Sequence, residues 1–153
     1  RPPHPNDNRS RLRLEVLEAR EVPATFTVNT LTDVVDPNDG LTSLREALQA
    51  ATDAGAGHHT IDFAAAQQGG TITLSDAATH RDLIVQPNPG VTGVEITIDG
   101  SAAGITVQRS ATTQVAHGLL DVGPGVYLTI ENLTFANGKS PTLGGAIWCA
   151  GDL

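Results

Sequence analysis

Apolar and polar residues alternate with two different periods along this chain. From residue 60 onward, Ile, Leu, Val and Phe alternate with Thr or acidic residues, which is typical of β-strands with one buried face. Before that point, the stretch 44–51 repeats its apolar residues at helical spacing. The pattern therefore predicts one short helix followed by many short strands.

From residue 60 onward, the predicted strands are only three to five residues long, and turn-forming Gly, Pro, Asn and Asp residues separate them. A leading strand at 25–30 comes before the helix. The later strands cover residues 60–63, 71–74, 83–85, 94–98, 105–107, 119–122, 126–130, 133–135 and 146–148.

Antiparallel hairpins in a sandwich and parallel strands in a solenoid both produce such a pattern. The strands are shorter than the usual five or six residues of a sandwich, and only 3% of residues are aromatic. The segment 126–138 also places two strands around one bend at Glu131 and Asn132, with Asn132 and Asn137 as turn or ladder residues. We therefore expect a mainly β fold, namely a right-handed parallel β-helix (solenoid) with a short N-terminal capping α-helix.

The helix has clear start and stop signals. Ser43 and Glu46 have the S-x-x-E spacing of a capping box, and Gly55 is placed to end the helix. An isolated short helix needs a packing partner, and the first coil of a solenoid needs a cover for its unpaired backbone groups. We predict that Ser43, Leu44, Glu46 and Leu48 form this cap.

The net charge of −8 is unevenly distributed. Residues 1–25 carry five Arg against four acidic residues, which gives +1 and leaves −9 for the remainder. An acidic body of this kind argues against binding to nucleic acid. No apolar run approaches the roughly 20 residues that span a bilayer, and the one cysteine excludes an internal disulfide.

An acidic loop precedes the helix and contains Asp33, Asp36 and Asp39. These carboxylates are candidate calcium ligands, although the spacing does not match an EF-hand. An Asx-rich turn that leads into the helix is the simpler interpretation of the loop. The adjacent His58 and His59 are expected in a solvated loop, because no His or Cys spacing here supports a zinc site.

The residues S-L-R-E-A at 43–47 follow V-N-T at 28–30 and the acidic loop. This arrangement resembles the domain named for the residues C-S-L-R-E-A, which is found near the N-terminus of bacterial surface and secreted β-helix proteins. Thr42 stands where that domain has its Cys, so no thiol chemistry is implied here. The phrase at 126–138 likewise resembles the coils of pectate-lyase-like β-helices.

Residues 14–23 read L-E-V-L-E-A-R-E-V-P and resemble the N-terminal tag of exported proteins from planctomycete-type bacteria. A frayed amphipathic helix with no export role is the alternative. We expect two parts: a disordered, export-type segment at 1–23 and a capped β-helix at 24–153. Because the chain stops at Leu153, just after the strand-like residues 146–148, we expect further C-terminal coils of the same protein.

Pectate-lyase-like β-helices include polysaccharide lyases and glycoside hydrolases, which place carboxylates and basic residues on one face. This chain lacks their D-D and G-H-G patterns. The groups available for such chemistry are Asp62, Asp76, Asp82 and Asp99, with Arg81 or Arg109.

The resemblance thus implies a non-catalytic extracellular or cell-surface protein with a structural, adhesive or glycan-contacting role. Its partners would be polysaccharide or cell-envelope components. Two alternatives remain open: the N-terminal part of a β-helix polysaccharide lyase or glycoside hydrolase whose active site lies beyond this chain, and a calcium-dependent binding module.

Overall fold

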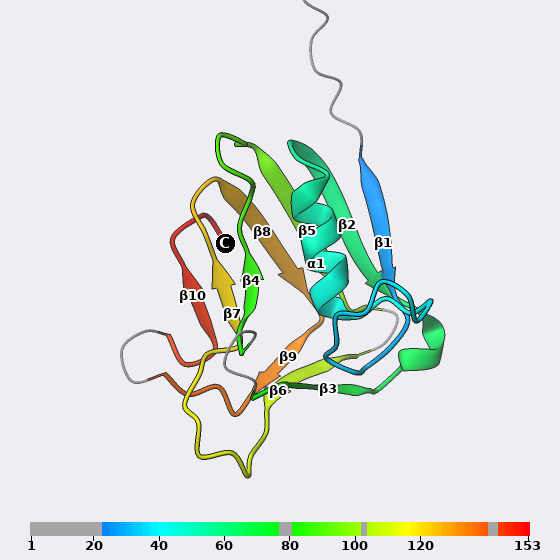
Figure 1. Ribbon diagram of the computed structural model, residues 1–153, viewed down its shortest axis with the longest axis vertical. Coiled ribbons are helices and arrows are strands. Elements are labelled where there is room, and N and C mark those ends of the chain that lie inside the picture. Colours follow the sequence, from blue (N-terminus) through cyan, green and yellow to red (C-terminus); the bar gives the residue numbers. More distant parts are fainter. Residues whose placement is uncertain (1–22, 77–80, 102–103, 141–143) are drawn as a thin grey trace, which may run out of the picture.

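The computed structural model describes residues 23–76, 81–101, 104–140 and 144–153 (Figure 1). The predicted disordered, export-type segment at 1–23 therefore lies, apart from Pro23, outside the described residues. The described ranges contain one α-helix, α1 (Leu44–Asp53), one 3-10 helix (Ala65–Gln67) and short strands. The strands are β1 (Ala24–Val28), β2 (Gly57–Phe63), β3 (Thr71–Leu74), β4 (Leu83–Val85), β5 (Val94–Asp99), β6 (Thr106–Arg109), β7 (Leu120–Val122), β8 (Val126–Glu131), β9 (Thr134–Ala136) and β10 (Ile147–Cys149).

The strands form three sheets, in which every strand pairing within the described ranges is parallel. Their orders are β1-β2-β5-β8, β3-β6-β9 and β4-β7-β10. After β1 and α1, the chain passes through the three sheets in the same order three times: β2 to β4, β5 to β7, and β8 to β10. The prediction of a mainly β protein with parallel strands is confirmed.

Side chains that share a position in neighbouring strands build the core. In the first sheet, Phe26, Ile61, Ile98 and Ile130 are paired in register, and Ile61 and Ile98 are fully buried. Residues from all three sheets and from α1 belong to one apolar cluster. The alternation in the sequence explains this arrangement, because successive side chains of a strand point to opposite faces.

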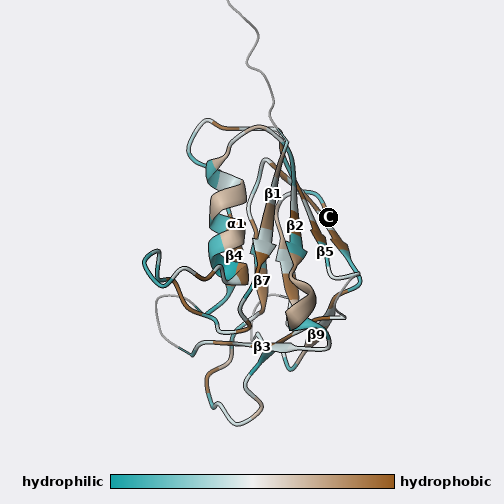
Figure 2. Ribbon diagram, turned by 90° about the vertical axis from the view of Figure 1, so that its right-hand side faces the viewer, coloured by the Kyte–Doolittle hydropathy of each residue, from teal (hydrophilic) through white to brown (hydrophobic). Residues whose placement is uncertain are grey.

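The helix runs alongside the strands, and it contacts β1, β2 and β4 (Figures 1 and 2). Its buried residues are Leu44, Ala47, Leu48, Ala51 and Thr52. Gly55, with φ of +88°, follows the C-cap residue Ala54, as its predicted role at the helix end requires. No helix in the described part of the chain has the length and hydrophobicity needed to cross a membrane.

Asparagines form the tight turns around β9. Asn132 and Asn137 have φ of +56° and +61°, a left-handed conformation that Asn tolerates better than most residues. Their side chains reach the preceding layer: Asn132 Nδ2 lies 3.4 Å from Asp99 Oδ1, and Asn137 Nδ2 lies 3.3 Å from Gln108 Oε1. The prediction that both are turn or ladder residues is confirmed.

The expectation for the histidine pair is wrong. His58 and His59 lie in β2 rather than in a solvated loop, because the alternation of β2 extends back to Gly57. His58 faces solvent beside Glu95, whereas His59 is 1% exposed and its Nε2 lies 3.1 Å from the carbonyl oxygen of Gly55. His59 thereby joins the end of α1 to β2.

Candidate functional site

The N-terminus of α1 is held by the predicted capping box. Ser43 Oγ accepts a hydrogen bond from the Glu46 N–H at 3.2 Å, and the Ser43 N–H donates to Glu46 Oε2 at 2.8 Å. The other carboxylate oxygen of Glu46 accepts from the Asp36 N–H at 2.8 Å. Glu46 therefore fastens the acidic loop to the helix as well as capping it.

These contacts change the pKa of the Glu46 carboxyl. Desolvation by partial burial raises the pKa of this carboxyl, but the N–H groups of Ser43 and Asp36 and the Ser43 hydroxyl outweigh it. The pKa is lowered as a result. A carboxyl with a lowered folded-state pKa adds stability above its unfolded-state pKa, and this stability is lost as pH falls through the folded-state value.

We expect Ser43→Ala to lower the free energy of unfolding by about 1 kcal/mol, since it removes the side-chain cap. Glu46→Gln is expected to weaken the dependence of stability on pH in the acidic range, because the ionised form is the one that the N–H groups stabilise. Urea denaturation followed by circular dichroism at pH 7 and pH 4 measures both effects. If the stability of Glu46→Gln depends on pH as strongly as that of the wild type, the ionised Glu46 carboxylate does not stabilise the helix cap.

The apolar side of α1 contacts the first strand of each flanking sheet. Leu44 and Leu48 are 2% and 1% exposed, and the helix touches β1, β2 and β4. In the sheet orders, β1 and β4 are edge strands. The helix thus lies against β4 at an edge that no further strand occupies among the described residues.

A buried ion pair connects the acidic loop to the helix. Arg45 donates from Nε and Nη2 to the two carboxylate oxygens of Asp33 at 2.8 and 2.9 Å. The side chains of Asp33 and Arg45 are 3% and 10% exposed. Asp33 also accepts from the Ser75 N–H at 2.7 Å, and Arg45 donates to the Asp82 carbonyl at 2.7 Å. The pair thereby joins the acidic loop and the helix to the residues that follow β3 and precede β4.

The geometry gives the calcium prediction no support. The Asp33 carboxylate is engaged by Arg45 and Ser75. Asp36 and Asp39 each accept from the N–H two residues ahead, at 3.0 and 2.7 Å, which are Asx turns. Across the described ranges, no three His, Cys, Asp or Glu side chains gather as a metal site would require.

The candidate catalytic carboxylates are divided between two places. Asp62 and Asp99 lie on β2 and β5 in the first sheet. Asp76 and Asp82 instead flank His117, with Oδ1 atoms 3.4 Å from Nε2 and 3.3 Å from Nδ1. The His117 side chain is only 3% exposed, whereas the side chains of Asp76 and Asp82 are 40% and 32% exposed, so solvent reaches the two carboxylates but hardly the imidazole.

The two candidate arginines, Arg81 and Arg109, differ in their hydrogen bonds. Arg109 donates to the carbonyl oxygens of Asn137, Thr113 and Val115, and it is 9% exposed. Its guanidinium therefore holds the connections around β6 together rather than facing a ligand. Arg81 is half-buried, and its Nε has no hydrogen-bond partner among the described residues.

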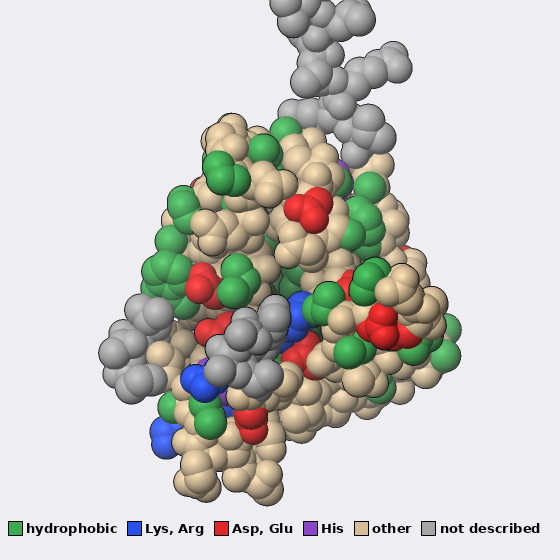
Figure 3. Space-filling view, in the orientation of Figure 1, with side chains coloured by type: hydrophobic (Ala, Val, Ile, Leu, Met, Phe, Trp, Pro, Cys, Tyr) green, Lys and Arg blue, Asp and Glu red, His purple; other side chains and the backbone are tan. Residues whose placement is uncertain are grey.

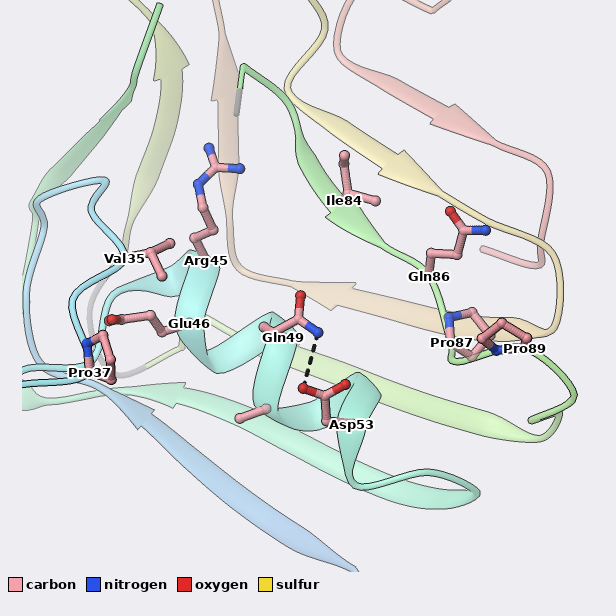
Figure 4. A pocket seen from close by; sticks show the side chains of 11 residues that line it. Val35, Pro37, Arg45, Glu46, Gln49, Asp53, Ile84, Gln86, Pro87 and Pro89 are labelled. Carbon is pink, nitrogen blue, oxygen red and sulfur yellow. Dashed lines mark hydrogen bonds between the residues drawn. The ribbon is translucent and has the colours of Figure 1, made fainter. Parts of the chain in front are cut away.

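Residues of α1 and of β4 line an open groove of about 920 Å³, a size within the range of ligand sites (Figure 4). Gln49 and Asp53 line it from the helix, and Ile84 and Gln86 line it from β4 and its end. The remaining lining residues are Val35, Pro37, Arg45, Glu46, Ala50, Pro87 and Pro89. Acidic side chains are spread over this face, with hydrophobic side chains between them (Figure 3).

The outer face of the sheet β4-β7-β10 continues this groove. Ile84, Asp121 and Trp148 are paired in register across the three strands. Ile84 is 53% exposed and Trp148 is 37% exposed, so the row faces solvent. Sequence reasoning did not single out this row. Each residue is the middle one of a three-residue strand in the structure, between two less exposed neighbours. The predicted ranges 119–122 and 146–148 concealed this pattern, because they place Asp121 third of four and Trp148 last.

Comparison with protein-family models, with curated proteins and with solved structures finds no match to this chain.

Proposed function

We propose that residues 24–153 form a helix-capped, right-handed parallel β-helix of a bacterial exported or cell-surface protein. Its role is structural or adhesive, through contacts of its long faces with polysaccharide or cell-envelope components. The observation that carries the proposal is the order in which the chain visits the three parallel sheets, which repeats three times. Each repeat corresponds to one coil, and stacked coils present long, regular outer faces.

The two ends of the stack differ, which supports the capping role of α1. At the first end, β1 and α1 lie against β2 and β4. At the other end, β8, β9 and β10 are edge strands, and Leu128, Ile130, Leu133, Phe135 and Ile147 line a shallow apolar pocket.

The backbone of Asp152 begins to pair on the bare end. Its N–H donates to the Val126 carbonyl at 3.0 Å, and its carbonyl accepts from the Leu128 N–H at 2.9 Å, in a parallel bridge. This pairing places Asp152 where a next strand on β8 would begin. The edge of β8 can therefore accept a parallel partner.

Co-sedimentation with insoluble polysaccharides and bacterial cell walls tests the adhesive role. We expect the full chain to be retained by at least one of these materials. Ile84 and Tyr127 are each 53% exposed but lie on different sheets. If the groove face makes the contact, Ile84→Ser reduces the bound fraction severalfold, while Tyr127→Ser serves as the matched control. Failure of the wild-type chain to bind any of these materials would contradict the adhesive role.

A further inference from the structure

Asp121 is an ionisable residue on the outer face of β7. It lies on β7 between Ile84 and Trp148, and its side chain points outward because Leu120 and Val122 are buried. Within the described ranges, no hydrogen bond or ion pair reaches its carboxylate. Burial and the nearby Asp82 carboxylate both raise the pKa of Asp121. A half-buried carboxylate in this environment is stabilised by a cation.

Trp148 supplies the second element of the site. Its position opposite Asp121 in a parallel pair places the two residues about 4.8 Å apart along the sheet. The face of an exposed indole attracts cations, and its flat apolar surface also stacks against a ring. The adjacent carboxylate and indole therefore suit a ligand that combines a positive charge with an apolar ring face.

The groove next to Ile84 has a polar and acidic lining. The next residue of the row, Ile84, opens onto the groove, whose rim carries the amides of Gln49 and Gln86. Asp53 also lines the groove, and its carboxylate accepts hydrogen bonds from two neutral amides, those of Gln49 and Asn88. With a net charge of −8, the protein disfavours uronate polymers and phosphates.

We propose that the row formed by Ile84, Asp121 and Trp148, together with the adjoining groove, binds a polysaccharide of amino sugars. A protonated sugar amine pairs with Asp121, the sugar ring stacks on Trp148, and the following rings extend past Ile84 into the groove. This inference rests on the proposed glycan-contacting role and specifies its ligand.

The chain contains a single tryptophan, so its fluorescence reports on this site alone. Titration with a glucosamine hexamer at pH 6 and low salt is expected to change the emission of Trp148 in a saturable way. Asp121→Asn is expected to weaken binding about tenfold, because it removes a charge-assisted interaction. Glu95→Gln, an equivalent change on the outer face of β5, is the control and should alter the dissociation constant less than twofold.

Calorimetry measures the affinities of the Trp148 variants, because these variants lack the tryptophan whose fluorescence would report binding. Trp148→Ala is expected to weaken binding of the hexamer about tenfold, and Trp148→Phe less, since Phe retains a ring. Circular dichroism establishes that each variant is folded. An unchanged affinity in folded Asp121→Asn or Trp148→Ala overturns the assignment.

Three further ligands separate this inference from the general proposal. Equal affinity for the N-acetylated hexamer overturns the role of the amine but leaves glycan contact in place. Tighter binding of a lysine hexapeptide than of the amino sugar overturns the sugar class. If the protein binds an alginate oligomer but not the glucosamine hexamer, the preference for a positively charged ligand is wrong. If no sugar binds, both this ligand assignment and glycan contact through this face are wrong.

Discussion

Leu48→Asp is expected to unfold the layer formed by β1 and α1 and to expose the strand edges beneath it. Leu48 is 1% exposed within the apolar cluster that joins the helix to the sheets. Truncating such a leucine costs about 2–5 kcal/mol, and a buried carboxylate adds a desolvation cost. The sum is a large part of the stability of a typical domain. We expect a much lower melting temperature and aggregation through the uncovered edges.

Thermal melting and size-exclusion chromatography measure these effects. Gln49→Asp places the same charge on the exposed side of the helix, next to Asp53, and is expected to cost no more than about 0.5 kcal/mol. If Leu48→Asp leaves the melting temperature and solubility unchanged, α1 does not act as a cap.

Asp33→Ala is expected to destabilise the protein by about 3–5 kcal/mol, because it leaves the guanidinium of Arg45 buried without its carboxylate. It also leaves the Ser75 N–H without its acceptor at Asp33. Arg45→Met combined with Asp33→Ala is expected to cost less than the sum of the two single changes, since neither charge then remains unpaired.

Chemical denaturation of the two single variants and the double variant gives the coupling energy between Asp33 and Arg45. Asp39→Ala is a suitable control, because Asp39 is exposed and its carboxylate accepts only the Leu41 N–H among the described residues. We expect it to cost about 0.5–1 kcal/mol. A loss of similar size for Asp33→Ala would show that the ion pair does not hold the acidic loop to the helix.

The local elements were predictable because each rests on neighbouring residues. Residues 71–74 and 83–85 were predicted with the bounds of β3 and β4, since the alternation and the turn residues both occur there. The S-x-x-E spacing likewise identified Ser43 as the N-cap. The prediction for β2 started only at residue 60, whereas the strand begins at Gly57, because the Gly-Ala-Gly context concealed the alternation around His59.

Strand partners and the ion pair were not predictable in this way, because they depend on the lengths of the connections. In the first sheet, Ala24 pairs with His59, Gly57 with Val94, and Val94 with Val126, which gives offsets of 35, 37 and 32 residues. Unequal offsets conceal a repeat from inspection of the sequence. The same irregularity separates Ile84, Asp121 and Trp148 in the chain, although the sheet places them side by side.

The order of the strands also bears on how the protein emerges from the ribosome. Within each sheet, later strands add on the side away from β1 and α1, so the next strand always finds an edge that is already made. Synthesis from the N-terminus therefore delivers the segments in the order in which they pair. Such a chain can fold vectorially, with each new group of three strands templated by the one before it.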